Sequence, residues 1–322
     1  MTPAARAARR PGSASAGPAG SGRASAPPAG QTVSSREFAA PAGQTASGRE
    51  FHFSARDFER VRRLIYQHAG ISLNDSKSNM VYSRLARRLR ALGLARFEDY
   101  LGMLERDEGG EREAFVNSLP TNLTSFFREP HHFPLLAQLL KGLPERDIHL
   151  WCSASSTGEE PYTMAITALD ALGARASRVR ILASDIDTQV LERASRGVYP
   201  LDAVARLDRD LVRRHFLRGT GAQEGFVRVR PEVRAMVTFQ RINLLDASWP
   251  IRARFDAIFC RNVMIYFDKP TQHRILQKFA PLLAPGGRLF AGHSENLGFA
   301  RDVFVPCGRT VYGTARDAKE GG

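Results

Sequence analysis

The chain has 322 residues, of which 43% are hydrophobic, and it carries a formal charge of +13 with an isoelectric point near 10.3. This length suggests one large domain or two smaller ones, and the basic balance indicates an acidic partner unless the excess charge is only solvated. No apolar run approaches a membrane span, no apolar signal core is found near the N-terminus, and the three cysteines lack metal-site spacing, so we expect a cytoplasmic protein with reduced thiols.

Residues 1–50 are rich in Ala, Gly, Pro and Ser and contain few large apolar side chains. Such a segment cannot bury enough surface to offset the entropy lost on ordering, so we predict a disordered low-complexity tail. The stretch 28–38 recurs nearly unchanged as 41–51. We favour a neutral duplication within a linker over a tethering motif.

Residues 51–122 show a series of helical patterns, which predict a small all-α domain. The first pattern begins with Ser54 and Asp57, which resemble a capping box, and ends at Gly70, a typical helix stop. The later patterns cover 77–92, 97–105 and 111–119. The helix at 77–92 has one apolar face.

That same helix is also basic. Arg87 and Arg90 lie opposite its apolar stripe, Arg84 and Arg88 lie near the edge of the stripe, and no acid occurs from residue 80 to residue 96. A charged helix face is usually only solvated, but a face of a single sign favours a surface that meets something acidic.

From residue 147 onward, strands and helices alternate, which predicts a doubly wound α/β sheet over about 123–316. The expected strands are 148–152, the run ending at Asp185, 243–245, 257–260, 288–291 and 310–312. Residues 197–241 interrupt this rhythm with a charged helical pattern, a glycine-rich turn, and two alternating runs at 226–229 and 236–239. We predict a half-exposed antiparallel β-ribbon inserted into the sheet, with a free edge at Phe226–Val229 that can pair with an extended peptide.

The strand at 257–260 ends abruptly in the polar residues Arg261 and Asn262, and Tyr266 follows four residues later. Ligands of open α/β sheets bind at the carboxyl ends of the strands, so this strand end is a candidate site. An ordinary loop after a buried strand explains the stretch equally well.

The first strand–helix turn and the second strand end add chemical detail. Glu159 and Glu160 follow the one glycine of the turn, and carboxylates there favour a cationic ligand over a pyrophosphate, although for Glu159 an ordinary helix-start acid is the favoured interpretation. Asp185 ends the second strand, where an acid binds the ribose diol of a nucleoside. The pattern therefore indicates a nucleoside cofactor, and S-adenosylmethionine, with a sulfonium and no phosphate, fits better than NAD.

These stretches closely resemble the CheR-type chemotaxis receptor methyltransferases, in the order that this family has, from about residue 53 onward. The matching motifs are Thr121–Arg128 (TNLTSFFR), Ser156–Tyr162 (STGEEPY), Ala183–Asp187 (ASDID), Phe255–Phe267 and Ala291–Asn296 (AGHSEN).

The resemblance implies a protein-glutamate O-methyltransferase, which converts S-adenosylmethionine to S-adenosylhomocysteine and receptor glutamates to methyl esters for chemotactic adaptation. The cofactor contacts that it implies are Asn122, Thr124, Arg128, Glu160, Asp185, Asn243, Leu244, Arg261 and Asn262. Arg128 and Tyr266 should flank the transferred methyl group. The arginines of the basic helix should meet an acidic receptor helix, and the ribbon should hold a receptor tail peptide as in some relatives. No metal, nucleic-acid partner or membrane insertion is expected.

The chemistry needs no general base, because a glutamate side chain with a pKa of about 4.3 is already ionised at neutral pH. Positioning by Arg128 and Tyr266 is therefore the expected contribution, and His293 is expected to be structural. One rival function is nucleic-acid methylation, since Asn262 to Tyr266 loosely resembles an Asn-Pro-Pro-Tyr motif, but both prolines are absent. A non-catalytic adaptor that binds the cofactor is the other rival, against which the intact Arg128 and Tyr266 argue.

Overall fold

The computed structural model describes residues 49–320. The predicted disordered tail and the duplicated stretch lie outside the described residues, except for their last few positions. Within the described range, no helix is both long and apolar enough to cross a bilayer.

The N-terminal helices form as the sequence predicts. They are α1 (Ala55–Ala69), α2 (Ser78–Leu92), α3 (Phe97–Glu105) and α4 (Glu111–Ser118). The capping box is present, because the Ser54 hydroxyl accepts from the Asp57 amide at 3.1 Å and the Asp57 carboxylate accepts from the Ser54 amide at 2.9 Å. Gly70 ends α1 with a φ of 64°, which favours glycine. Their apolar faces meet in one core around Val61, Ile65 and Leu85.

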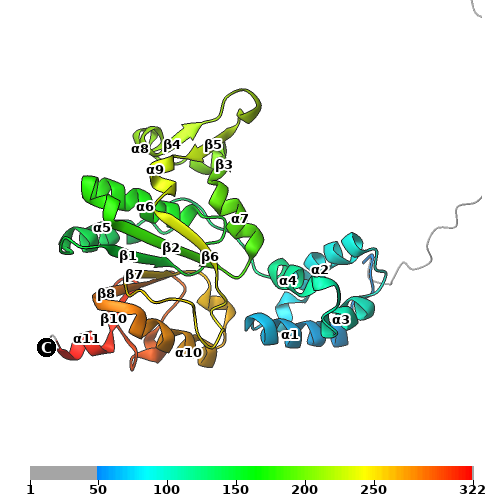
Figure 1. Ribbon diagram of the computed structural model, residues 1–322. Helices are drawn as coiled ribbons and strands as arrows, with labels where there is room; N and C mark the ends of the chain where they lie inside the picture. Colours follow the sequence, from blue (N-terminus) through cyan, green and yellow to red (C-terminus); the bar gives the residue numbers. More distant parts are fainter. Residues whose placement is uncertain (1–48, 321–322) are drawn as a thin grey trace, which may run out of the picture. The chain divides into compact units, whose positions relative to one another are not determined.

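The rest of the described chain is built on a mixed sheet in the order β6-β2-β1-β7-β8-β10-β9 (Figure 1). Its strands are β1 (Ile148–Cys152), β2 (Val179–Asp185), β6 (Val237–Arg241), β7 (Phe255–Cys260), β8 (Leu283–Ala291), β9 (Phe304–Gly308) and β10 (Val311–Thr314). Pairing is parallel from β6 through β8 and antiparallel at β10 and β9. Every residue of β7, the middle strand, is buried, as expected for a strand covered on both faces.

Side-chain alternation along these strands divides the core into two layers. Leu150 and Phe259 pack with the helices α5 (His132–Gly142) and α6 (Glu159–Leu172), whereas Trp151 and Ile258 pack with α10 (Lys269–Phe279). Helices therefore cover both faces, which confirms the doubly wound α/β class, and α7 (Thr188–Arg196) follows β2.

The inserted ribbon differs from the prediction in its membership. The small antiparallel sheet has the order β3-β5-β4, made of β3 (Val198–Pro200), β5 (Phe226–Val229) and β4 (Phe216–Arg218), flanked by α8 (Arg209–His215) and α9 (Pro231–Arg234). The second run assigned to the ribbon, 236–239, belongs instead to β6, which pairs in parallel with β2. An edge strand is only half covered, so its burial alternates like that of a ribbon strand.

Two further expectations are wrong. Residues 243–245 form a loop after β6 rather than a strand. The strand β5 lies between β3 and β4, so its edges are paired and the free edge predicted at Phe226–Val229 does not exist. The C-terminal strand pair β9–β10 and the short helix α11 (Ala315–Glu320) complete the described chain.

Candidate active site

The carboxyl ends of β1, β2 and β7 open into one pocket of about 920 Å³, counting the part that is open to solvent. Every residue predicted to contact the cofactor or the transferred methyl lines it: Asn122, Thr124, Arg128, Glu160, Asp185, Asn243, Leu244, Arg261, Asn262 and Tyr266. The basic-helix arginines Arg84, Arg87, Arg88 and Arg90 are not part of this lining.

Asp185 organises the first turn of the sheet. One carboxylate oxygen accepts the Ser156 amide at 2.8 Å and the other accepts the Asp187 amide at 3.1 Å. Burial raises the pKa of Asp185, and these backbone hydrogen bonds oppose that rise. The turn itself is tight, since a Cβ on Gly158, which has a φ of 98°, would lie 2.8 Å from the Tyr199 hydroxyl.

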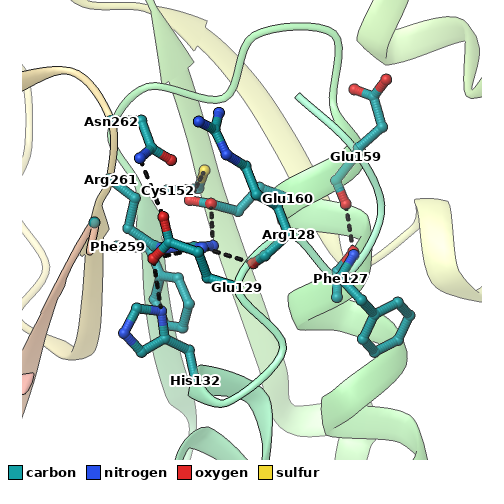
Figure 2. A network of polar contacts seen from close by, with 12 residues as sticks. Phe127, Arg128, Glu129, His132, Cys152, Glu159, Glu160, Phe259, Arg261 and Asn262 are labelled. Atoms are coloured by element: carbon teal, nitrogen blue, oxygen red, sulfur yellow. Dashed lines mark hydrogen bonds and ion pairs between the residues drawn. The ribbon is translucent and has the colours of Figure 1, made fainter. Parts of the chain in front are cut away.

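Glu160 is buried at the start of α6 and is paired with Arg261. Its Oε2 lies 2.6 Å from the Arg261 Nη1, and its Oε1 accepts from the Cys152 thiol at 3.3 Å (Figure 2). Burial raises the pKa of Glu160, and the charge of Arg261 works against that rise. Glu159 does not line the pocket and accepts from the Thr157 hydroxyl at 2.7 Å. This geometry agrees with a helix-start role for Glu159.

Arg261 is the centre of the polar network in Figure 2. Its side chain has no exposed surface, and besides Glu160 it binds the Arg128 carbonyl oxygen at 2.6 Å and lies 3.3 Å from the Glu129 carboxylate. Both terminal nitrogens of the guanidinium are therefore occupied by protein groups. Through it, the end of β7 fixes the segment that carries Asn122, Thr124 and Arg128.

Glu129, which the sequence analysis missed, does not line the pocket but binds two residues that do, Arg261 and Asn262. It accepts from Asn262 Nδ2 at 3.1 Å, from the His293 amide at 3.0 Å and from His293 Nδ1 at 2.7 Å. Burial favours a higher pKa, but hydrogen bonds from His293 and Asn262 and the charge of Arg261 prevail and lower it to about 2. These contacts agree with the structural role expected for His293. The one sequence signal that could have identified Glu129 was its position directly after Arg128.

Glu129, His131 and His132 also bring three metal-ligating atoms within 4.8 Å of one another. The carboxylate is already engaged by Arg261 and His293, and the guanidinium charge would repel a divalent cation. We therefore interpret this cluster as part of the Arg261 network and assign no ion to it.

Arg128 and Tyr266 reach the pocket from different segments. Arg128 Nη1 donates to the Leu123 carbonyl at 2.7 Å, and the Tyr266 hydroxyl lies 3.4 Å from both the amide and the carbonyl oxygen of Thr121. Both side chains are only half-buried, so their polar ends can still bind a ligand.

Two family models match the chain in tandem. The model of the CheR methyltransferase all-alpha domain matches residues 56–120, and the model of the CheR methyltransferase SAM binding domain matches residues 122–312. The chain belongs to the CheR methyltransferase family. It is therefore an enzyme, an S-adenosylmethionine-dependent methyltransferase, as the sequence analysis predicts.

Curated relatives agree with this assignment. A chemotaxis protein methyltransferase of Klebsiella aerogenes is 56% identical over 81% of this chain and 90% of its own length. The chemotaxis protein methyltransferase 2 of Pseudomonas aeruginosa is 53% identical over 82% of this chain and 95% of its own. The Escherichia coli chemotaxis protein methyltransferase is 52% identical over 81% of this chain and 91% of its own length.

The donor set of the CheR pocket fits S-adenosylmethionine. Asp185 presents a carboxylate at the strand end, a position suited to a ribose diol, and Glu160, paired with Arg261, places a second carboxylate in the lining. Each of these oxygens has a second lone pair beyond its protein partner, so ligand hydrogen bonds remain available. A pyrophosphate would face two carboxylates, which argues against a dinucleotide.

The basic helix of the CheR all-α domain is less free than its sequence suggests. Arg88 forms a two-point ion pair with the buried Glu111, Arg90 does the same with Glu50, and Arg84 donates to the Leu119 carbonyl. The compensating acids, Glu111 and Glu50, lie in other segments of the chain, so the sequence of the helix alone does not reveal them. Among the described residues, Arg87 alone of the four makes no such contact and is exposed.

Proposed function

We propose that this CheR methyltransferase transfers the methyl group of S-adenosylmethionine to glutamate side chains of chemoreceptors. The observation that carries the proposal is the convergence of Arg128 and Tyr266 on the pocket that Asp185 also lines. An anion-binding group and a hydroxyl beside a nucleoside site suit a carboxylate acceptor. The names of the relatives, chemotaxis protein methyltransferases, support the same acceptor.

The reaction is a direct displacement. When bound, S-adenosylmethionine supplies an electrophilic methyl group, and the ionised glutamate oxygen forms a bond to the methyl carbon as the carbon–sulfur bond breaks. The electron pair of that bond stays on sulfur, which becomes neutral, and no proton moves. The protein has to align the two reactants and exclude water.

Arg128 and Tyr266 would provide that alignment. A guanidinium can hold a carboxylate at two points, and the Tyr266 hydroxyl can donate to one of its oxygens. Full neutralisation would weaken the nucleophile. Because Arg128 already shares one N–H with the Leu123 carbonyl, we expect it to position the acceptor rather than to bind it tightly.

We further propose a division of labour along the chain. Residues 51–122 would recognise the acidic methylation region of a cytoplasmic receptor helix, with Arg87 as the most available cation, and residues 123–316 would bind the cofactor. The small sheet β3-β5-β4 would hold a receptor tail peptide at a free edge.

The test is methyl transfer to receptor membranes from the same organism with methyl-labelled S-adenosylmethionine. We expect label on the receptor that mild base releases as methanol, because methyl esters hydrolyse and N-methyl groups do not. The variant Tyr266→Phe, which loses only the hydroxyl, should bind S-adenosylhomocysteine normally and label slowly. Base-stable label, or no label from protein that binds S-adenosylhomocysteine, would overturn the proposal.

A further inference from the structure

The segment from Asn262 to Tyr266 carries two of the proposed site residues, Asn262 just before a short helical turn, Met264–Tyr266, and Tyr266 at the end of that turn. Asn262 enters it with a φ of 57°, a left-handed conformation that asparagine adopts more readily than most residues other than glycine. The first N–H groups of such a turn have no partner within the turn. Something outside the segment must satisfy them and hold the conformation.

Glu295 supplies the partner for the amides at the entry of this turn, those of Asn262, Val263 and Met264. Its Oε1 accepts from the amides of Val263 at 2.9 Å and Met264 at 2.8 Å, and its Oε2 accepts from the amides of Asn262 at 2.8 Å and Gly292 at 2.6 Å. The residue is only 4% exposed. It does not line the pocket, so its effect on a ligand must pass through the segment that it holds.

A carboxylate suits this position better than any side chain of similar shape. Only an ionised carboxylate offers four acceptor sites and no donor, and the N–H groups here fill both oxygens. Glutamine would turn its own N–H groups toward two backbone donors. The fit is also close, because a Cβ on Gly292 would lie 2.7 Å from both the Glu295 Oε2 and the Asn262 Nδ2.

We propose that Glu295 is a positioning residue of the cofactor site, which fixes Asn262 against the cofactor and Tyr266 against the methyl acceptor. The effect on Asn262 follows from the fold of the site alone. The effect on Tyr266 rests on the proposed function, because it concerns the acceptor.

The test compares Glu295→Gln with Glu295→Asp by calorimetric titration with S-adenosylhomocysteine. If Glu295 acts as an acceptor of N–H groups, the shorter aspartate should bind better than the isosteric glutamine, and glutamine should weaken affinity by about tenfold or more. A residue that only fills space would give the reverse order, because glutamine preserves volume and aspartate does not.

Asp256→Asn is the matched control. Asp256 is another buried carboxylate, at the opposite end of β7, and it accepts from Arg146 and the His149 amide. Its variant should lower thermal stability and leave cofactor affinity unchanged. Unchanged affinity in Glu295→Gln, or aspartate binding worse than glutamine, would overturn the inference. Absence of methyl ester formation by the natural protein would instead contradict the proposed function.

Discussion

Asp185 binds two backbone amides of the protein, and under the proposed function the same carboxylate would accept a hydrogen bond from the ribose of the cofactor. Replacing it with alanine should remove a charge-assisted hydrogen bond to the ribose, worth about 1.5–3 kcal/mol, and should weaken S-adenosylhomocysteine binding accordingly in calorimetry. Part of the loss would come through the turn, since Ser156 also binds this carboxylate.

Glu159→Gln is a suitable control for that variant. Glu159 lies in the same turn and is buried, but it does not line the pocket. Its replacement should leave affinity unchanged, whereas equal affinities of the natural protein and Asp185→Ala would exclude a ribose contact.

His132 makes stability sensitive to acid. It is completely buried, with Nε2 2.8 Å from the Thr310 hydroxyl, and it faces Arg261, Arg309, His131 and Glu129. Burial, reinforced by Arg261, lowers its pKa to about 3 from about 6.5 in the unfolded chain. Between these pH values only the unfolded chain binds the proton. The free energy of unfolding should therefore fall on acidification, by at most ~1.4 kcal/mol per pH unit.

The variant His132→Gln should flatten this dependence in denaturant unfolding measured between pH 7 and pH 4. His52→Gln, at an exposed position, should leave the slope of the natural protein unchanged. If the free energy of unfolding depended on pH with the same slope in the natural protein and in His132→Gln, this histidine would not be the source of the acid sensitivity.

Single residues were predictable from the sequence where a strand end marked them. Asp185, Arg261 and Asn262 each end a strand or follow its last residue, so the direction of the strands brought them together. Glu129 and Glu295 were assigned no role because their significance depends on polar groups far away in the chain. Asn262, which binds Glu129 through its side-chain amide and Glu295 through its backbone amide, lies 133 and 33 residues from them. Nothing in the local pattern around either glutamate indicates those partners.

At the scale of elements, the same limit applies to β6. The alternation of exposed and half-buried side chains along β6 is typical of any edge strand. Because both sheets have such edges, the pattern does not indicate which sheet the strand joins. The strands β1 and β7 were predictable because continuous apolar runs occur when a strand is covered on both faces.

Helix α2 offers a test of receptor recognition at this scale. Arg87 is exposed and without a partner among the described residues, so Arg87→Glu should raise the apparent KM for the receptor and leave cofactor affinity alone. The effect should shrink as salt rises, because exposed charges are screened. Activity that is insensitive to both the variant and salt would contradict electrostatic recognition by α2.

Arg88→Ala is the contrasting variant on the same helix. It would leave the buried Glu111 carboxylate without its ion pair, so we expect a clear loss of thermal stability. At a temperature where the variant is folded, its KM for the receptor should change less than that of Arg87→Glu. If both arginines affected KM equally, recognition would depend on the total charge of the helix.

At the scale of the whole described chain, the pocket combines distant segments. Ala69 and Ile71, at the end of α1, line it beside the strand ends, and the Ser72 amide donates to the Tyr266 carbonyl at 2.7 Å. The helical part of a CheR methyltransferase thus takes part in closing the cofactor site. We therefore expect that a chain truncated to begin at residue 72 would not bind the cofactor, even though Asp185 and the other strand-end residues would still be present.

The proposed binding of a receptor tail peptide requires an unpaired edge on the small sheet. β5 is paired on both sides, and β3 contains Pro200, which has no N–H to donate. The remaining edge is β4. Gly219 donates to Phe226, so by the alternation of an antiparallel ladder the neighbouring Arg218 amide points away from β5.

A docked peptide should therefore pair with the Arg218 amide, and Arg218→Pro should abolish that pairing without removing a hydrogen bond of the sheet. Titration with C-terminal peptides of the organism's own receptors, followed by amide NMR, should shift residues 216–218 in the natural protein and not in the variant. Cofactor affinity is the control and should be equal in both. If no peptide shifts these amides at millimolar concentration, the small sheet is scaffold, and receptor encounter depends on the methylation helix alone, without the gain in effective concentration that a tether provides.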